Sequence, residues 1–192
     1  MIQIRIHGRG GQGVVTAAEL IAIAGFKEGL YAQALPSFGV ERSGAPIQAF
    51  ARLDQNEIII REHIYQPNFI IIQDSSLLSA VDVLFGADKK TIIIINTSKS
   101  PTETLTNIKA QKIQSFIPNV SQIKTIDATK IALEILGKNL MNTVILGSFA
   151  KLSGHISLKS LNLAIADKFL QKGPEMISKN QQAADRAYQT LN

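Results

Sequence analysis

Two short isoleucine-rich runs do most to restrict the fold of this chain. Phe69–Ile72 and Thr91–Ile95 show no alternation between apolar and polar positions, which is typical of strands buried on both faces of a parallel sheet. Between them, Ser75–Phe85 fits a crossover helix that ends near Gly86, with Asp74 or Ser75 as a candidate N-cap. A strand, a helix and a strand at this spacing form a βαβ unit, so we expect an α/β fold.

The N-terminal part predicts more strands of the same sheet. Alternating residues over Ile2–Ile6 indicate a strand, and a helical pattern follows from Val14 to Lys27. Tyr31–Leu35 is expected to be extended. Ile47–Leu53 and Glu57–Arg61 flank a turn-like Asp-Gln-Asn segment, which predicts a hairpin.

The last third of the chain is expected to be helical. A short strand at Ile123–Ile126 leads into a helix over Ala128–Leu136, and three helical patterns follow at Asn142–Leu152, Leu158–Leu170 and Pro174–Tyr188. We therefore predict a Rossmann-like fold: a mostly parallel sheet flanked by helices, with a helical C-terminal third. We see no linker, and predict a single domain over residues 1–192.

A glycine cluster lies between the first predicted strand and the first predicted helix. Its sequence, Gly8-Arg9-Gly10-Gly11-Gln12-Gly13, satisfies the GxGxxG pattern. Glycines permit a tight backbone with positive φ, so that several amides and a helix N-terminus face outward and favour a phosphate or another anion. Arg9 could add a side-chain contact to that anion.

The dinucleotide interpretation of this motif lacks one residue. A Rossmann site carries an acid about 20 positions further on, at the end of the second strand, to hold the ribose. Tyr31–Leu35 contains no acid, and Glu28 falls near the end of the preceding helix. No Lys-Ser/Thr pair follows the last glycine, so the motif is not a Walker A loop. Close packing of helix and strand is the alternative role for these glycines.

A second glycine- and proline-containing loop runs over Phe38–Pro46 and contains Glu41, Arg42 and Ser43. An arginine among small residues can bring its guanidinium to an anion or a carboxylate. Because loops after parallel strands converge at one edge of the sheet, this loop and the glycine cluster are expected to form one site. The alternative is an exposed loop with weak ion pairs.

The residue inventory excludes several kinds of chemistry. The chain contains no cysteine, which excludes a disulfide scaffold, a thiol nucleophile, a cysteine-ligated iron–sulfur cluster and a zinc finger. His7, His63 and His155 are far apart and form no metal-ligand pattern, and Ser76 and Ser148 lie outside any nucleophile elbow. We therefore predict no catalytic residues and no metal site in this chain.

Charge and hydropathy restrict the partners of the chain, and its lack of cysteine fits a cytoplasmic location. The formal net charge of +5 suits an anionic ligand or an acidic partner, and the absence of a basic block argues against nucleic acid. Apolar runs such as Ile92–Ile95 are far shorter than the roughly 20 residues that span a bilayer. The N-terminus alternates apolar and polar residues, so we expect no signal peptide and no membrane association.

Taken together, the two loops resemble a known family. A strand leading into GRGGQGVVTAAE, followed by PSFGVERSGAPIQAFARL, is similar to the gamma subunit of 2-oxoacid:ferredoxin oxidoreductases, with the pyruvate and 2-oxoisovalerate enzymes closest. The likeness continues through FIIIQDSSLL, NTVILGSFAKLSG and KNQQAADRAY and covers essentially the whole chain. Matching positions are Gly8, Gly10, Gly11, Gln12, Gly13 and Val14 in the first loop, and Glu41, Arg42, Gly44 and Pro46 in the second. Ser43 stands where the family often has glycine, a mild departure.

This resemblance implies a function that needs several subunits. Such enzymes, pyruvate synthase among them, decarboxylate a 2-oxoacid oxidatively on thiamine diphosphate with Mg²⁺. They pass electrons through [4Fe–4S] clusters to ferredoxin or flavodoxin, and transfer the acyl group to coenzyme A. The other cofactors reside mainly on the alpha, beta and delta partners, while the gamma part is linked to coenzyme A binding. A chain without cysteine fits that role, and the isolated chain is expected to be inactive.

Two other functions stay open at this point. A free-standing nucleotide-binding or regulatory module would use the GxGxxG loop and bind a nucleotide tightly. An interaction protein would use both loops for protein contacts alone.

Overall fold

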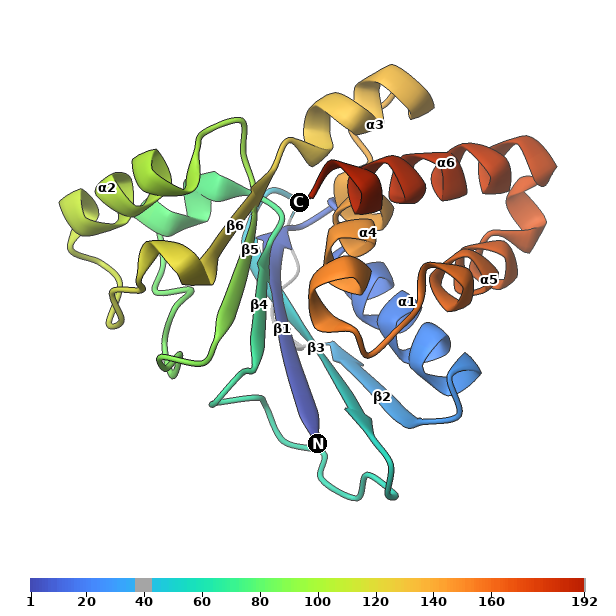
Figure 1. Cartoon of the computed structure of the whole chain (residues 1–192), viewed down its shortest axis with the longest axis horizontal. Helices are drawn as coiled ribbons and strands as arrows, with labels where there is room; N and C mark the ends of the chain where they lie inside the picture. The colour runs from blue at the N-terminus through green and yellow to red at the C-terminus, as the bar shows by residue number, and fades with distance from the viewer. Residues whose placement is uncertain (37–42, 192) are drawn as a thin grey trace.

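A six-stranded sheet forms the centre of the molecule, with helices on both of its faces (Figure 1). The computed structural model describes residues 1–36 and 43–191. The strands are β1 (Ile2–Arg9), β2 (Tyr31–Pro36), β3 (Pro46–Asp54), β4 (Phe69–Ile72), β5 (Ile92–Asn96) and β6 (Ile123–Ile126). The α-helices are α1 (Val14–Lys27), α2 (Pro101–Gln111), α3 (Ala128–Leu136), α4 (Met141–Ser153), α5 (Leu158–Lys168) and α6 (Pro174–Thr190). Short 3₁₀ turns are η1 (Ser75–Ser79), η2 (Val120–Gln122) and η3 (Leu170–Lys172).

The strands lie in the order β2-β3-β1-β4-β5-β6. Strands β1, β4, β5 and β6 run parallel to one another, with Ile6 opposite Ile71 and Ile71 opposite Ile94. Strand β3 pairs antiparallel with both β1 and β2. The predicted α/β fold with a mostly parallel sheet is confirmed.

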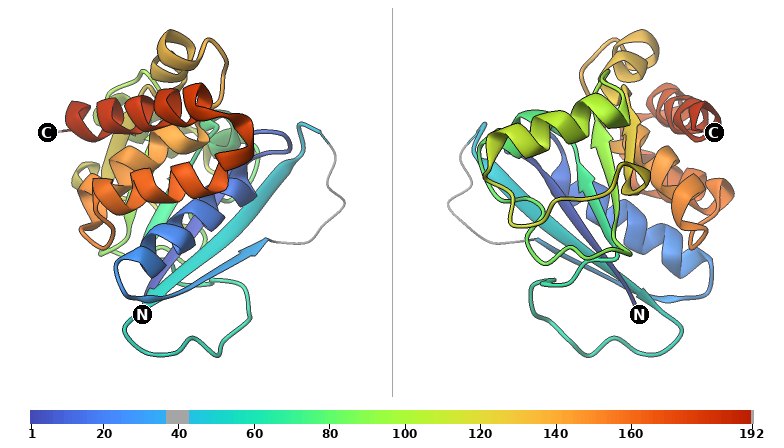
Figure 2. Two further views of the ribbon diagram at one scale, coloured as in Figure 1. Left: turned by 90° about the vertical axis from the view of Figure 1, so that its right-hand side faces the viewer. Right: turned by 60° about the vertical axis from the view of Figure 1, so that its left-hand side comes forward.

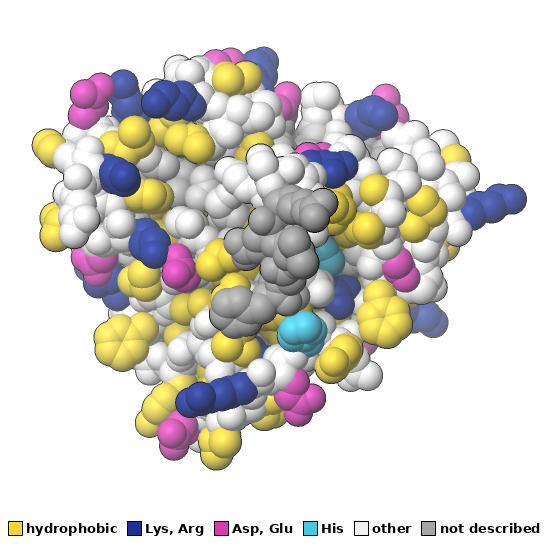
Figure 3. All heavy atoms as spheres, turned by 180° about the vertical axis from the view of Figure 1, so that it is seen from behind, with side chains coloured by type: hydrophobic (Ala, Val, Ile, Leu, Met, Phe, Trp, Pro, Cys, Tyr) yellow, Lys and Arg dark blue, Asp and Glu magenta, His cyan; other side chains and the backbone are white. Residues whose placement is uncertain are grey.

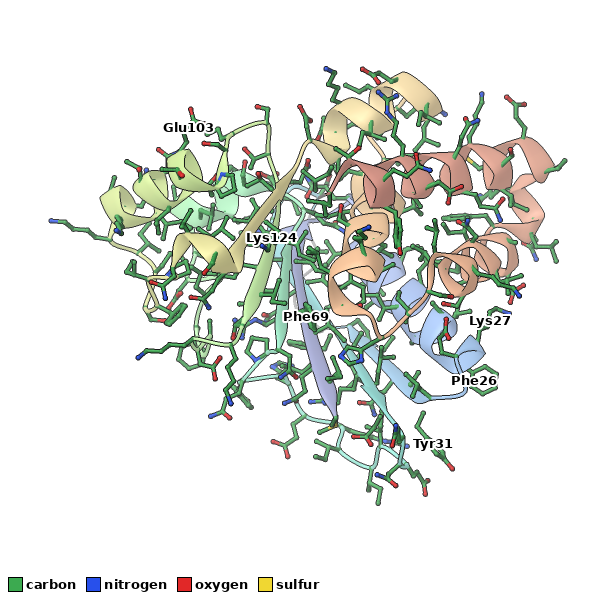
Figure 4. All side chains as sticks on the ribbon, viewed as in Figure 1. Phe26, Lys27, Tyr31, Phe69, Glu103 and Lys124 are labelled. Carbon is green, nitrogen blue, oxygen red and sulfur yellow. The ribbon has the colours of Figure 1, made fainter. Side chains whose placement is uncertain are left out.

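Strands β4 and β5 are buried on both faces, as their sequences predict. Ile71 and Ile94 point into the larger hydrophobic core, whereas Ile70 and Ile93 point into a smaller core on the opposite face. Phe69, at the centre of the molecule in Figure 4, packs edge-to-face against Phe149 of α4, with ring centroids 5.3 Å apart. Continuous apolar strands are therefore required here, because neither face of these strands meets water.

Helices α1, α4, α5 and α6 cover one face of the sheet, and α2 lies on the other (Figures 1 and 2). Lys27, at the end of α1 (Figure 4), forms an ion pair of 2.6 Å with Asp167 of α5. Helix α2 begins at Pro101 with a capping box between Ser100 and Glu103. The predicted helical C-terminal third is confirmed.

The hairpin predicted for residues 47–61 is wrong. Glu57–Arg61 forms no strand, and β3 pairs instead with β2 and β1. Asp54 closes a local turn by accepting the Asn56 N–H at 2.9 Å. The turn was predicted correctly, but strand partners from elsewhere in the chain already occupy both edges of β3.

The crossover helix predicted for Ser75–Phe85 is also wrong, since only one 3₁₀ turn forms, over Ser75–Ser79. The Gln114 side chain explains the difference. Its amide donates to the Leu78 and Val81 carbonyls and its oxygen accepts the Leu84 N–H. A distant side chain therefore satisfies backbone groups that a helix would pair internally.

Other predicted bounds agree with the structure. Val14–Lys27, Ile123–Ile126 and Ala128–Leu136 form elements with these same limits, and Asp127 caps α3 by accepting the Lys130 N–H at 2.9 Å. Within the described residues, no helix combines the length and the apolar character that crossing a bilayer would require.

Candidate functional site

The candidate site lies where the connections from two neighbouring strands leave in opposite directions. From β1 the chain passes through α1 towards β2, on one side of the sheet, whereas from β4 it passes through η1 to β5, on the other. Ligands of open α/β sheets bind at such a switch point, beyond the carboxyl ends of the strands. Here it brings the glycine cluster after β1 next to Gln73 and Asp74 after β4.

The two loops expected to form one site do meet in the structure. Gly10 donates its N–H to the Ala45 carbonyl at 2.9 Å, and Gly44 donates to the Gly10 carbonyl at 3.1 Å. Ser43 is exposed beside this contact. Arg42 lies outside the described residues, so its predicted role stays a prediction from the sequence.

Glycine is required at two places in the first loop. Gly13 precedes α1 in the left-handed conformation, with φ 71°, and a β-carbon there would lie 2.6 Å from Asn142 Nδ2. A β-carbon on Gly8 would lie 2.5 Å from Val14 Cγ2 and 3.1 Å from Gln73 Oε1. Glycine is therefore required at both positions because neighbouring side chains pack directly against them at the start of α1.

Helix α1 begins without any side-chain cap. Gly13 is its N-cap and has no side chain that could accept a hydrogen bond from the first turn, and no acidic residue lies in that turn. The first N–H groups of a helix have no intrahelical partner and carry the positive end of the helix dipole. The start of α1 is therefore suited to bind an anion.

Arg9 holds the loops together. Its Nε lies 3.1 Å from Asp74 Oδ2, its Nη1 donates to the Gly44 carbonyl at 3.0 Å, and its Nη2 donates to Ser76 Oγ at 2.8 Å. All three nitrogens of the guanidinium thus have partners within the chain. Its predicted contact to an anion stays a prediction, and the observed bonds assign it a structural role.

Gln12 completes this network from inside the glycine cluster. Its Oε1 accepts the Arg9 N–H at 2.8 Å, and its Nε2 donates to Asp74 Oδ2 at 3.0 Å. Partial burial alone would raise the pKa of Asp74, but hydrogen bonds from Ser76 and Gln12 and the Arg9 charge hold that pKa below its usual value. Asp74 also caps η1 through the Ser76 N–H, which confirms its predicted capping role.

Two cavities flank Gln12. One, of about 420 Å³, lies beyond the ends of β4 and β5 and is mainly polar, lined by residues that include Gln73, Asp74, Asn96, Lys99, Asp127 and Thr129. The other, of about 260 Å³, lies against the start of α1 and is lined by Gly11, Gly13, Thr16, Phe169, Lys172 and Met176 among others. The start of α1 thus faces a recess that contains one lysine.

The histidines do not belong to this site. His7 is buried, and its Nε2 accepts a hydrogen bond of 3.0 Å from Arg5 Nε. Burial and the Arg5 charge lower the pKa of His7 to about 3, and burial lowers the pKa of Arg5 to about 10. Among residues 1–36 and 43–191, no three metal-ligating side chains cluster.

Among the described residues, no acid lies at the end of β2, where a dinucleotide site would hold the ribose. Strand β2 ends at Pro36 without an acidic residue. Glu28, which has roughly the required spacing, follows the C-terminal end of α1 and accepts the Ser157 N–H at 2.9 Å. Hydrogen bonds from Ser157 and Ser160 lower the pKa of Glu28. Glu28 therefore contacts the start of α5, and it lies at the end of α1 opposite the glycine cluster.

Sequence reasoning missed Gln73 and Asn96, which both line the larger cavity. A common signal could have identified them, since each polar residue closes an isoleucine run at the carboxyl end of a buried strand. Asn96 bonds the Gln73 carbonyl and Thr129 Oγ1, both at 2.9 Å. Only Asp74 was singled out from this region.

Comparison with known proteins gives one consistent family. Residues 3–190 match the pyruvate ferredoxin/flavodoxin oxidoreductase family. The pyruvate/ketoisovalerate oxidoreductases common subunit gamma of Pyrococcus furiosus is 47% identical over 189 residues, which cover 98% of this chain and 96% of that protein. The crystal structure of the pyruvate oxidoreductase subunit PORC of Thermotoga maritima superposes with a TM-score of 0.81 at 30% identity, covering 100% of this chain and 97% of that one.

A third comparison shows the same fold inside a longer chain. The 2-oxoglutarate:ferredoxin oxidoreductase of Magnetococcus marinus, solved with 2-oxoglutarate, coenzyme A and succinyl-CoA bound, superposes with a TM-score of 0.70 at 20% identity. The match covers 100% of this chain but only 31% of that one.

Proposed function

Because the chain belongs to the pyruvate ferredoxin/flavodoxin oxidoreductase family, as a gamma subunit of a pyruvate or 2-oxoacid:ferredoxin oxidoreductase, we propose that it supplies part of the coenzyme A site of that complex. The binding residues would be Gly8, Arg9, Gly10, Gly11, Gln12, Gly13, Arg42 and Ser43. The amides at the start of α1 would receive a phosphate. Arg9 and Gln12 would hold the loops in place around it.

The uncapped start of α1 is the observation that carries this proposal. Gly11 has no atom within 4 Å of its ideal β-carbon, and the adjoining cavity of about 260 Å³ presents Lys172 as a second positive group. Coenzyme A brings phosphate groups and a thiol, and supplies the acceptor for the acyl group. Binding and orienting its phosphates would leave the thiol end free to reach a neighbouring subunit.

The test uses a pair of variants at Thr16, which lies in the first turn of α1 and lines this cavity. Thr16→Glu adds a negative charge where the helix dipole favours it, so the fold is kept, but the charge repels a phosphate. In the assembled oxidoreductase we expect the KM for coenzyme A to rise about tenfold or more, which is about 1.4 kcal/mol. The KM for the 2-oxoacid should stay unchanged.

Thr16→Gln is the matched control, because it adds the same length without charge. An unchanged KM for coenzyme A in Thr16→Glu would refute the proposed phosphate position. An equal rise in both variants would indicate that steric bulk, and not charge, is responsible, and would refute it too.

We also propose that residues 1–192 act as one domain that docks on partner subunits. The larger hydrophobic core extends from Ile4 in β1 to Ala187 in α6, which joins both ends of the chain. The chain contains no cysteine, so thiolate-held [4Fe–4S] clusters, and with them thiamine diphosphate and Mg²⁺, would reside on the alpha, beta and delta subunits. Ferredoxin or flavodoxin would accept electrons from those subunits.

The side of β1 and β3 away from α1 is the surface proposed for docking, and we call it the rear face. It contains a cavity of about 300 Å³ with Arg5 and His7 in its lining, and the exposed rings of Tyr65 and Phe85 also line it. Figure 3 shows hydrophobic side chains exposed on this side of the molecule. Exposed aromatic residues around a recess are typical of protein interfaces.

A free-standing nucleotide-binding module has less support. The relatives reported above carry the names of oxidoreductase subunits, and the ribose-binding acid of a dinucleotide site is missing from the end of β2.

A further inference from the structure

Gln73 differs from the two other buried glutamines of the chain. The amide of Gln114 makes three hydrogen bonds, to Leu78, Val81 and Leu84. The amide of Gln122 also makes three, to Asp88, Thr91 and Asn119. These two side chains hold loops in place, so the fold itself accounts for their burial.

The amide of Gln73 has no such role. The side chain is fully buried, yet neither Oε1 nor Nε2 has a hydrogen-bond partner within the described residues. The backbone of Gln73 is fully engaged, because its N–H donates to the His7 carbonyl at 2.8 Å and its carbonyl accepts from Asn96. A buried amide without partners costs about 1–3 kcal/mol, so the fold would be more stable with an apolar residue here.

The position of Gln73 links this amide to the candidate site. It lies at the switch point between β1 and β4, and it lines the polar cavity of about 420 Å³. Its Oε1 would lie 3.1 Å from a β-carbon on Gly8, so the absence of that β-carbon leaves room for the amide beside the first residue of α1. The amide is therefore adjacent to the glycine cluster, and the same residue borders the polar cavity.

The chemistry of the cavity selects the group that Gln73 can bind. Asp74 and Asp127 contribute two carboxylates to its lining against the single ammonium of Lys99, and this excess of negative charge disfavours a phosphate there. A glutamine amide offers a donor and an acceptor side by side, and it pairs with a neutral group that offers the same two functions, such as a purine edge or an amide.

We infer that Gln73 is a ligand-binding residue that reads a neutral donor–acceptor group, a purine edge or an amide, in the cavity beyond β4 and β5. This inference rests on the proposed coenzyme A site and extends it. Phosphate is received at the start of α1, and an uncharged part of the same ligand is received beside Gln73. Coenzyme A carries both kinds of uncharged group, the purine at one end and the amides of its pantetheine arm.

The test compares Gln73→Met with Gln114→Met in the assembled oxidoreductase. We expect Gln73→Met to raise the KM for coenzyme A about tenfold with kcat unchanged, as expected for the loss of one or two neutral hydrogen bonds. Its unfolding midpoint should stay the same or rise. Gln114→Met should lower the unfolding midpoint by about 3 °C or more and leave the KM unchanged.

A second substrate distinguishes the purine from the amide. 4′-Phosphopantetheine carries the amides but no purine. A rise in KM for coenzyme A alone indicates that Gln73 reads the purine, and an equal rise for both compounds indicates the amide. Gln73→Leu, of similar volume, provides a second variant, and it should behave as Gln73→Met does.

Three outcomes would overturn the inference. If neither KM changes in Gln73→Met while Thr16→Glu still raises the KM for coenzyme A, Gln73 is not a binding residue and the proposed function stands. If Gln73→Met loses as much thermal stability as Gln114→Met, the amide is structural. A lack of effect in both Thr16→Glu and Gln73→Met would remove the proposed function together with the inference.

Discussion

At the scale of single residues, hydrogen bonding separates structural polar groups from candidate binding groups. Arg9 has bonds within the chain at each of its three guanidinium nitrogens, whereas Gln73 has none at its amide. Arg5 and His7 are also structural, since Arg5 donates to His7, Ile64 and Val83 beneath the rear face. A polar residue whose bonds the fold does not supply is the stronger candidate for a ligand contact.

The buried His7 predicts how acid affects stability. Its folded-state pKa of about 3 lies below the ordinary value of 6.5, so the unfolded chain binds a proton between these two values and the folded chain does not. The free energy of unfolding therefore falls as pH decreases from 6.5, by up to about 1.4 kcal/mol per pH unit for one proton. His7→Gln keeps an acceptor for Arg5 but cannot take up that proton.

We expect the loss of stability between pH 7 and pH 4.5 to be shallower in His7→Gln, as measured by urea unfolding at several pH values. His155→Gln, at an exposed position, is the control and should keep the slope of the parent protein. Parallel curves for His7→Gln and the parent would show that His7 does not dominate this acid response.

At the scale of elements, the packing of helices depends on close approach at small residues. Gly147 lies inside α4, and a β-carbon there would overlap the backbone carbonyl of Ala184 in α6. The two helices therefore approach each other more closely than larger residues would permit. Because α4 packs against the sheet through Phe149 and against α6 through Gly147, this contact ties the outermost helix to the core.

Gly147→Ala should destabilise the protein by about 2–3 kcal/mol, because the extra methyl group forces the two backbones apart. Gly137→Ala is the comparison: Gly137 has φ 67° and no atom within 4 Å of its ideal β-carbon, so it incurs only local backbone strain of about 1 kcal/mol. Chemical denaturation measures both. A Gly147→Ala protein no less stable than Gly137→Ala would refute the close approach.

At the scale of the whole molecule, the two faces of β1 and β3 differ in how they are covered. Helices cover β1 and β3 on one side, while the rear face is bounded by the loops that carry Tyr65 and Phe85. Arg5 fixes these loops through the Ile64, Val83 and Phe85 carbonyls. The proposed docking surface is therefore held by a buried guanidinium and does not depend on the partner for its shape.

The docking proposal predicts a selective loss of assembly. The double variant Tyr65→Ser/Phe85→Ser removes two exposed rings, which are 58% and 54% accessible, so it should keep the fold and weaken association by about 2 kcal/mol or more. Phe26→Ser is the matched control, since Phe26 is 74% exposed at the far end of α1 (Figure 4). Co-purification with the partner subunits, quantified by size-exclusion chromatography, measures the association. If the double variant and Phe26→Ser assemble equally well, the rear face is not the interface.

Much of the fold could be predicted from the sequence because its signals are local. Continuous isoleucine runs predicted buried parallel strands, and glycines next to a helical pattern predicted the start of α1 at its actual first residue. The predictions of the hairpin and the crossover helix were wrong because residues far away in the sequence determine both segments. Strands β2 and β1 pair with the two edges of β3, and the Gln114 side chain hydrogen-bonds backbone groups of the segment after β4. Contacts between residues that are far apart in the sequence produce no periodic pattern of apolar and polar residues within either segment.

The candidate site likewise combines features that local sequence determines with features that only tertiary contacts determine. The sequence by itself determined the glycine loop, the start of the helix that follows it and the family, because backbone freedom and side-chain type are properties of consecutive residues. The convergence of the two loops could also be predicted, but tertiary structure alone decided which atoms join them, that Arg9 is held by Asp74 and that the Gln73 amide is left without a partner. Each of these depends on which strands become neighbours, since neighbouring strands bring residues 35 to 65 positions apart into hydrogen-bond contact.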